Sequence, residues 1–173
     1  MTDGIPGRAW PRELLWAVLV IAVATMAYGW AARSERPAPA GLVGHGLGVA
    51  GFLLMVVAET AYTWRKRPTR TGPGPAVRWL EAHVFVGLVG PYLVLLHTAF
   101  RFRGLAGVLT LLMAVVVGSG VAGRYWYTTA LPVGPERPRR ALWYVLHVPL
   151  SAVLFALAAF HVVGVLYYAG NLR

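Results

Sequence analysis

Five long apolar stretches alternate with short polar segments along the chain. They cover residues 14–32, 41–64, 79–100, 105–122 and 141–168. A helix needs about 20 predominantly apolar residues to cross the hydrocarbon core of a bilayer. The pattern therefore predicts an all-α fold, a polytopic membrane bundle of five transmembrane helices, in a single domain that covers residues 1–173. We expect membrane lipid to cover much of its surface.

The first apolar stretch, residues 14–32, has a second interpretation as a signal peptide. Residues 38–40, Ala-Pro-Ala, have the small side chains of a cleavage site. However, Arg33, Glu35 and Arg36 separate the two features, and the apolar run is long for the core of a signal peptide. We therefore expect an extra N-terminal span before four further helices, and cleavage remains the alternative.

The composition supports a membrane protein and excludes several kinds of cofactor site. Hydrophobic residues make up 58% of the chain and charged residues 13%, which is more apolar than soluble domains of this size. The sequence contains no cysteine. This excludes disulfides, covalently attached c-type haem, cysteine-ligated iron–sulfur clusters and thiolate zinc sites.

The formal net charge of +10 comes from arginines and a lysine that lie mainly between the apolar stretches. In short loops such residues determine topology, so we expect no nucleic acid as a partner. Eleven of the 16 basic residues fall on the side of the N-terminus, and five fall on the other side. The positive-inside rule then places the N-terminus in the cytoplasm and the C-terminus outside.

Residues 46–51 match the G-x-G-x-x-G pattern of dinucleotide-binding loops. That pattern binds a dinucleotide when it follows a strand and opens a helix. Here it lies inside an apolar span, so the dinucleotide interpretation lacks its structural context. We expect close helix packing instead, with Gly44 and Gly48 as a small-xxx-small pair.

Four of the five histidines follow a repeated spacing. His83 and His97 are fourteen positions apart in the third apolar stretch, and His147 and His161 are fourteen apart in the fifth. Fourteen residues of α-helix rise about 21 Å and leave the two side chains about 40° apart around the axis. Each pair therefore shares one helix face, with one histidine near each side of the membrane.

The third and fifth spans run parallel because one span lies between them. Depth then pairs His83 with His147 near the cytoplasmic side, and His97 with His161 near the outer side. Each pair can supply two axial imidazoles to one porphyrin from opposite faces. The spacing therefore predicts two stacked, non-covalent haem b groups, whose iron atoms these four histidines ligate.

Small and basic residues near the histidines fit this interpretation. Gly87 and Gly90 lie on the same stripe as His83 and His97, where they leave room for a flat ligand. Arg101 and Arg103 follow His97 by about one turn and are candidates to bind the propionates of the outer haem. The candidates at the inner haem are Arg124 and Arg140.

Other metals and packing are the alternatives. Histidines inside membrane spans often make packing hydrogen bonds, although ionisable groups there are candidates for function. Zinc or copper would need a third and a fourth ligand at each depth, for example Glu81 or His45. Transport of protons or metal ions would also favour more carboxylates inside the spans, where only Glu59 and Glu81 lie nearby.

His45 stands outside the fourteen-residue pattern. It begins the second span on the outer side, at about the depth of His97. Packing is one interpretation. The functional interpretation is a proton-accepting or substrate-binding residue beside the outer haem, for example at a quinol site.

The paired histidines resemble those of di-haem cytochromes b, and in particular of the ferric-reductase-like transmembrane domain family shared with NADPH oxidases. Residues 90–103 and 118–125 look like those of small bacterial members of this family, and the resemblance covers roughly residues 41–168. It implies a protein of the bacterial cytoplasmic membrane. The oxidases and ferric reductases continue into a flavin- and nicotinamide-binding domain after a sixth span, whereas this sequence ends after five spans.

These observations lead to three functional hypotheses. The first is transmembrane electron transfer by a membrane cytochrome subunit, with a redox partner subunit, a soluble electron carrier or a quinone as the partner. The second is a stand-alone reductase of external ferric iron, oxygen or superoxide. The third is a membrane protein that binds or transports metal ions with the same histidines.

Overall fold

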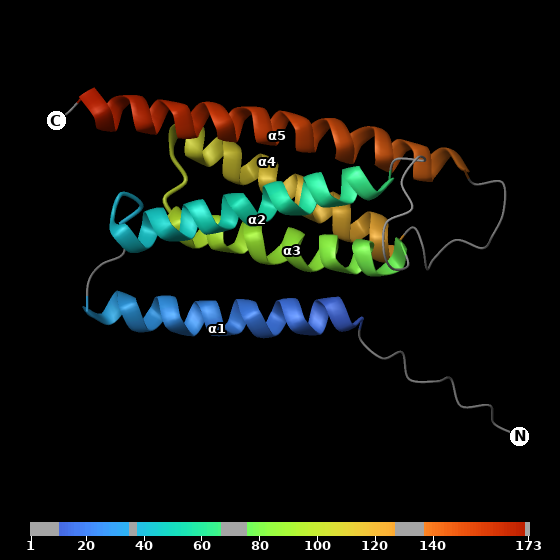
Figure 1. Ribbon diagram of the computed structural model, residues 1–173, viewed down its shortest axis with the longest axis horizontal. Coiled ribbons are helices and arrows are strands. Elements are labelled where there is room, and N and C mark those ends of the chain that lie inside the picture. The colour runs from blue at the N-terminus through green and yellow to red at the C-terminus, as the bar shows by residue number, and fades with distance from the viewer. Residues whose placement is uncertain (1–10, 35–37, 67–75, 127–136, 172–173) are drawn as a thin grey trace, which may run out of the picture. The chain divides into compact units, whose positions relative to one another are not determined.

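The computed structural model describes residues 11–34, 38–66, 76–126 and 137–171. Within these ranges the chain is all-α, with five long helices, one short π-helical turn and no strand. The long helices are α1 (Arg12–Ser34), α2 (Leu42–Lys66), α3 (Ala76–His97), α4 (Gly104–Val121) and α5 (Arg137–Asn171), as labelled in Figure 1. The predicted fold class is confirmed.

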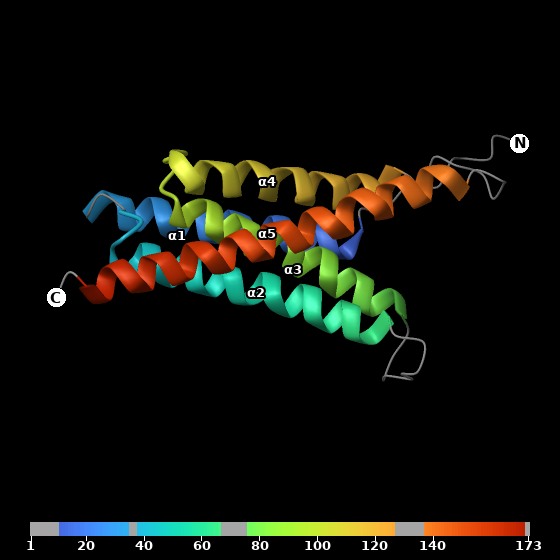
Figure 2. The same ribbon diagram turned by 90° about the horizontal axis from the view of Figure 1, so that it is seen from above.

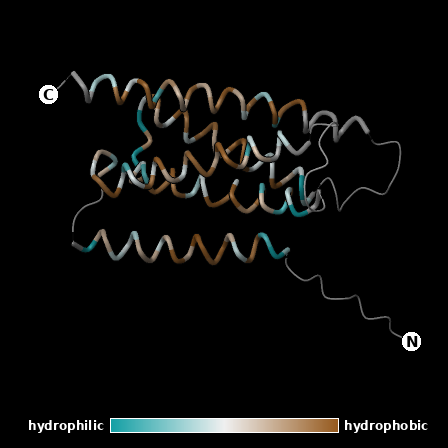
Figure 3. The backbone as a smooth tube through the Cα atoms, in the orientation of Figure 1, coloured by the Kyte–Doolittle hydropathy of each residue, from teal (hydrophilic) through white to brown (hydrophobic). Residues whose placement is uncertain are grey.

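All five helices are long and apolar enough to cross a membrane. In α1 the apolar residues fill the middle of the helix and hydrophilic residues mark both ends (Figure 3). Large apolar side chains such as Trp30, Leu111 and Phe160 are exposed, which suits contact with lipid tails. By their length and composition these helices identify an integral membrane protein.

The helices extend beyond most of the predicted apolar stretches, but α3 ends earlier than expected. Hydropathy predicted a span to Phe100, whereas α3 ends at His97. Ala99 and Phe100 have φ angles of 46° and 58°, in the left-handed region that an α-helix cannot use. The turn therefore lies at residues 98–100, inside the predicted apolar stretch 79–100, and Arg103 is extended ahead of α4.

Thr98 holds this turn together. Its buried hydroxyl donates to the carbonyl of Leu95 at 2.7 Å and accepts the backbone N–H of Phe100 at 3.1 Å. One side chain thus satisfies a carbonyl of the last helical turn and an amide of the turn that follows. This local bonding ends α3 at His97.

The described chain forms two compact units. The first contains α1, the part of α2 from Gly46 onward and the part of α3 up to Val94. The second contains residues 38–45, the end of α3 from Leu95, and α4 and α5. The sequence predicted one domain, and the division crosses two of its helices.

In the first unit, α2 and α3 approach closely at two glycines. A Cβ atom added to Gly51 would lie 2.6 Å from the carbonyl oxygen of Gly90, and one added to Gly90 would lie 3.0 Å from that of Gly51. The glycine of α2 that packs here is Gly51, and Gly44 of the predicted pair lies elsewhere. Gly44 instead accommodates the backbone of Ala38 and Pro39.

The second unit is built on α4 and α5, which pack against each other. Figure 2 shows them drawing together toward the end of α4 and the beginning of α5. The five-residue π-helical turn η1 (Ala122–Trp126) continues α4 where the sequence predicted a loop from Gly123. Residues 127–136 of that loop lie outside the described residues, as does the side chain of Arg140.

Candidate functional site

His83 is oriented by the backbone of a neighbouring helix. It lies on α3 and is half-buried, and its Nδ1 atom is 3.1 Å from the carbonyl oxygen of Ala58 on α2. A carbonyl oxygen can only accept a hydrogen bond, so Nδ1 carries the proton. In the neutral imidazole the lone pair then resides on Nε2, which is the nitrogen that would ligate a metal.

His97 has the same arrangement in the second unit. It is the last residue of α3, and its Nδ1 atom lies 2.8 Å from the carbonyl oxygen of Gly44. Nδ1 is again the donor, and Nε2 again carries the lone pair. Gly44 can occupy this position because it has no Cβ, which would collide with the carbonyl oxygen of Ala38.

His147 is held by a side chain. Its Nδ1 atom lies 2.8 Å from the hydroxyl oxygen of Ser119 on α4. That hydroxyl donates its single proton to the carbonyl of Val116, also at 2.8 Å. Both contacts are hydrogen bonds at once only when the serine oxygen accepts the Nδ1 proton of His147, and this arrangement gives His147 the same tautomer as the other two.

Gly120 provides the surface on which the His147 ring lies. A Cβ atom at Gly120 would be 3.1 Å from Cε1 of His147, whereas one at Gly118 would meet nothing within 4 Å. The serine thus sets the direction of the Nδ1 bond, and the absence of a side chain at Gly120 leaves room for the imidazole ring. Nearby on α5, the hydroxyl of Ser151 donates to the backbone carbonyl of His147.

The three histidines share one pattern, since each places Nδ1 against an acceptor from a neighbouring helix and therefore carries its lone pair on Nε2. Metal-ligating histidines almost always donate their second ring N–H to a carbonyl, a carboxylate or water. This bond fixes the tautomer and orients the ring. The residues of the chain therefore fit axial ligation of a haem iron.

The two units divide the predicted ligands between them. His97 and His161 both belong to the second unit, where they lie within electrostatic range of each other. His83 belongs to the first unit and His147 to the second. The members of the predicted outer pair therefore lie in one compact unit, and those of the predicted inner pair lie in two.

His45 lies beside His97. The two ring centroids are 6.3 Å apart with an interplanar angle of 61°, an edge-on contact. His45 is exposed, whereas His97 is half-buried. His45 therefore presents an accessible imidazole next to His97, one member of the predicted outer pair.

The structure distinguishes the two glycines that the sequence grouped together. Gly87 has open space where a Cβ would be, as a flat neighbouring ligand would require. Gly90 is buried, and the backbone of Gly51 and the side chain of Met55 fill the space beside it. Only Gly87 therefore offers room on this stripe of α3.

The predicted propionate partners lie in two places. Arg101 and Arg103 are exposed, just beyond the turn that follows His97. Arg124 is half-buried in η1, with its guanidinium 5.7 Å from the ring centre of Tyr125. Arginine in such positions can bind carboxylates by paired hydrogen bonds.

Sequence reasoning missed the residues that anchor the imidazoles. Ser119 could have been recognised in the sequence, because it is a small hydroxyl residue between two glycines in an otherwise apolar span. The anchors at Ala58 and Gly44 act through backbone carbonyls, which every residue carries. Contacts of this kind have no sequence signature.

In the part of the chain that the structure describes, no three His, Cys, Asp or Glu side chains gather in the manner of a metal site. No protein-family model matches the sequence, and neither a curated protein nor a solved structure matches it.

Proposed function

We propose that this protein is an integral-membrane b-type cytochrome that carries electrons across the bilayer through two non-covalent haem b groups. His83 and His147 ligate the inner haem, and His97 and His161 ligate the outer haem. The fourteen-residue spacing sets the two pairs of histidines about 21 Å apart in height. Each haem supplies a one-electron redox centre when it is bound.

The observation that carries this proposal is the common orientation of three imidazoles. His83, His97 and His147 each direct Nδ1 to an acceptor on another helix. A ligand to iron needs a lone pair that faces the metal, and an imidazole that donates its Nδ1 proton carries this lone pair on Nε2. Three histidines with this tautomer support ligation together with the fourteen-residue spacing.

The number of ligands favours haem over another metal. Structural zinc sites in proteins take four protein ligands, and catalytic ones take three. A bis-histidine haem takes only two, because the porphyrin supplies the other four nitrogens. In the described residues these histidines have no further clustered ligands, and such pairs fit a bis-histidine haem site.

The chain would tune these redox centres through its own groups. Hydrogen bonds to Nδ1 raise the basicity of a ligating imidazole, and burial among apolar helices controls the access of water. Arg101 and Arg103 would neutralise the propionates of the outer haem, and Arg124 would do the same for the inner haem. Gly87 leaves space beside the porphyrin.

The proposed setting follows from charge and from resemblance. The protein would lie in the bacterial cytoplasmic membrane, with its N-terminus in the cytoplasm and its C-terminus outside. It would be a small member of the ferric-reductase-like transmembrane domain family. A partner subunit, a soluble carrier or a quinone would exchange electrons with it.

The position of His45 favours a second candidate function. An exposed imidazole 6.3 Å from that of His97 can bind a small acceptor or deliver a proton at the outer haem. The protein would then reduce external ferric iron, oxygen or superoxide by itself. In this case His45→Ala slows reoxidation of the reduced protein by the acceptor and leaves its haem content unchanged.

Purified full-length protein tests the cytochrome proposal. We expect a reduced-minus-oxidised spectrum with the α-band of b-type haem, and a pyridine haemochrome assay that gives two haems per chain. His83→Ala and His147→Ala should remove the same haem, and His97→Ala and His161→Ala the other. A sample without the α-band overturns the proposal, and a shared phenotype of His83→Ala and His161→Ala overturns the pairing.

A further inference from the structure

Residues 98–103 connect α3 to α4 and carry a short run in which aromatic and basic side chains alternate. The run is Phe100, Arg101, Phe102 and Arg103. Phe100 is 55% exposed and Phe102 is 52% exposed, and both arginines are exposed as well. The proposed function uses the arginines beside the outer haem and gives the two phenylalanines no role. We call these six residues the α3–α4 loop.

Phe100 has a backbone conformation that suits it poorly. Its φ angle is 58°, and that of Ala99 is 46°. A bulky side chain rarely adopts this left-handed region, whereas glycine enters it without a steric penalty. The exposed ring of Phe100 also adds little to the packing of the fold. The strain therefore indicates that the ring serves a contact outside the chain.

Backbone contacts order the rest of the loop. The N–H of Arg101 donates to the carbonyl of Thr98 at 3.0 Å, and the N–H of Gly107 donates to the carbonyl of Arg103 at 3.3 Å. A Cβ atom at Gly107 would lie 3.0 Å from the carbonyl group of Phe102, so α4 approaches the loop closely here. Because the backbone of the loop is already ordered, a partner that binds its side chains loses little conformational entropy.

The α3–α4 loop lies at the boundary between the hydrocarbon core and water. The membrane-spanning part of α3 ends at His97, and that of α4 begins at Gly104. A loop of six residues cannot rise far above this boundary. Aromatic rings are enriched there, and arginines extend from there to the headgroups. Lipid is therefore the most accessible partner for the two exposed rings.

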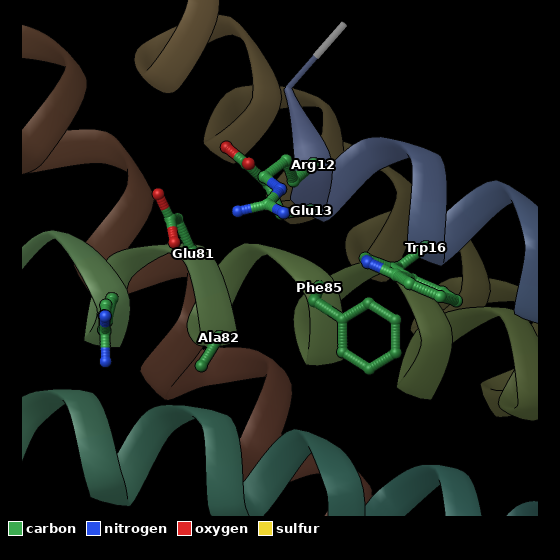
Figure 4. Close-up of a pocket in the computed structure, with 7 residues that line it drawn as sticks. Arg12, Glu13, Trp16, Glu81, Ala82 and Phe85 are labelled. Carbon is green, nitrogen blue, oxygen red and sulfur yellow. The ribbon is translucent and has the colours of Figure 1, made fainter.

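The charges of the loop favour an anionic partner. The described residues of the second unit contain no aspartate or glutamate that could compensate Arg101 and Arg103. The opening between α1 and α3 in Figure 4 is different, because the carboxylates of Glu13 and Glu81 lie among its arginines. The described part of the second unit thus carries uncompensated positive charge at the membrane boundary, and this charge attracts anions.

We propose that the α3–α4 loop binds the headgroup of an anionic membrane phospholipid. Arg101 and Arg103 donate charge-assisted hydrogen bonds to the phosphate oxygens, and the two phenylalanine rings enter the apolar layer beneath the headgroup. A guanidinium has five N–H donors, so the same arginines can also serve the haem propionates. The inference goes beyond the proposed haem function and does not depend on it, because it rests on the backbone, the depth and the charge of the loop.

Native mass spectrometry of the purified full-length protein, with equal amounts of phosphatidylglycerol and phosphatidylcholine, tests the inference. We expect phosphatidylglycerol to be retained preferentially. Arg101→Gln and Arg103→Gln should each lower this preference by about two- to fivefold, the effect of one arginine near an anionic surface. Arg33→Gln is the matched control, because Arg33 is exposed at the end of α1, next to Trp30, and lies outside the loop. This variant should keep the wild-type preference.

Phe100→Gly separates lipid contact from folding. Glycine relieves the strained φ angle, so the thermal stability and the helical circular dichroism signal should be kept or raised. Loss of the ring should nevertheless lower the retention of phosphatidylglycerol about three- to tenfold, which corresponds to burial of the exposed half of the ring. Ala99→Gly relieves the same kind of strain without loss of a ring, and it should retain the lipid as the wild type does.

Other outcomes overturn the inference. Equal retention of the two lipids would show that the loop has no preference for an anionic headgroup. An effect of Arg33→Gln as large as that of the loop variants would reduce the preference to general attraction by any arginine at the interface. Displacement of the lipid by inorganic phosphate or by soluble polyglutamate would assign the loop to a free anion or to an acidic protein. Haem content, measured on the same samples, distinguishes failure of this inference from failure of the haem proposal.

Discussion

The hydroxyl of Ser119 accepts the Nδ1 proton of His147 across the contact between α4 and α5, at 2.8 Å. Its own proton is engaged by the carbonyl of Val116. One small side chain therefore determines which nitrogen of His147 carries the lone pair. This dependence of a candidate ligand on a neighbouring helix can be tested directly.

Ser119→Ala should weaken the inner haem site. Loss of a group that orients a ligating histidine typically lowers metal affinity about 10- to 100-fold. We expect a lower ratio of haem to protein and a shifted midpoint potential for one haem only. Ser151→Ala is the matched control, because it removes a hydroxyl that bonds to the backbone of His147 and not to its ring. Equal effects of the two variants would contradict a specific role for Ser119.

Gly120→Ala should displace the His147 ring. The added Cβ would lie 3.1 Å from Cε1, so the imidazole or the helix must shift by a few tenths of an ångström. We expect a changed low-temperature electron paramagnetic resonance signal of one haem, since this signal reports the angles of the axial ligands. Gly118→Ala, on the same helix with open space at its Cβ, should leave the signal as it is. If Gly118→Ala also changes the signal, the effect comes from a general disturbance of α4 and not from contact with the His147 ring.

Gly51→Ala should destabilise the first unit. Its Cβ would lie 2.6 Å from the backbone oxygen of Gly90, which cannot move without the helix. Forced repacking of this kind costs about 1–3 kcal/mol. Gly46→Ala, where nothing lies within 4 Å, should be neutral or stabilising by up to about 1 kcal/mol. Reversible unfolding in mixed micelles would measure both, and a neutral Gly51→Ala would contradict the close approach of α2 and α3.

Thr25 and Tyr92 should prove energetically coupled. Their hydroxyl oxygens are 2.5 Å apart and link α1 to α3. Hydrogen bonds between membrane helices contribute about 0.6 kcal/mol on average, and up to about 1.7 kcal/mol. Thr25→Val and Tyr92→Phe should therefore destabilise to a similar extent, and the double variant should add little. Tyr28→Phe serves as the tyrosine control, and additive effects of the first two changes would show that no bond joins them.

The sequence predicted the helices because an apolar run of about 20 residues in a membrane must satisfy its own backbone hydrogen bonds, which a helix does. It placed the end of α3 three residues too late, at Phe100 and not at His97, because hydropathy does not register the side-chain bonds of Thr98. The sequence also did not show that Gly87 has open space beside it whereas Gly90 packs against α2. That difference depends on where α2 approaches, which no local pattern encodes.

The candidate ligands were easier to predict than their supports. His83, His97, His147 and His161 are recognisable because a fixed spacing on a helix sets a fixed face and depth. The groups that orient three of them come from other helices. Two of these groups are main-chain oxygens, and Ser119 alone belongs to a side chain.

The carbonyl anchors of His83 and His97 have a consequence for how this protein tolerates substitution. Any residue at position 58 keeps a carbonyl oxygen, so a change of side chain there does not delete the anchor of His83. Any residue at position 44 would likewise keep the carbonyl oxygen that accepts from His97. However, a side chain there would collide with the backbone of Ala38, so glycine is still required. His147 differs, because a single replacement of Ser119 removes its support. Of the three anchored imidazoles, the one on α5 is the one that a single substitution of its hydrogen-bond acceptor can disable.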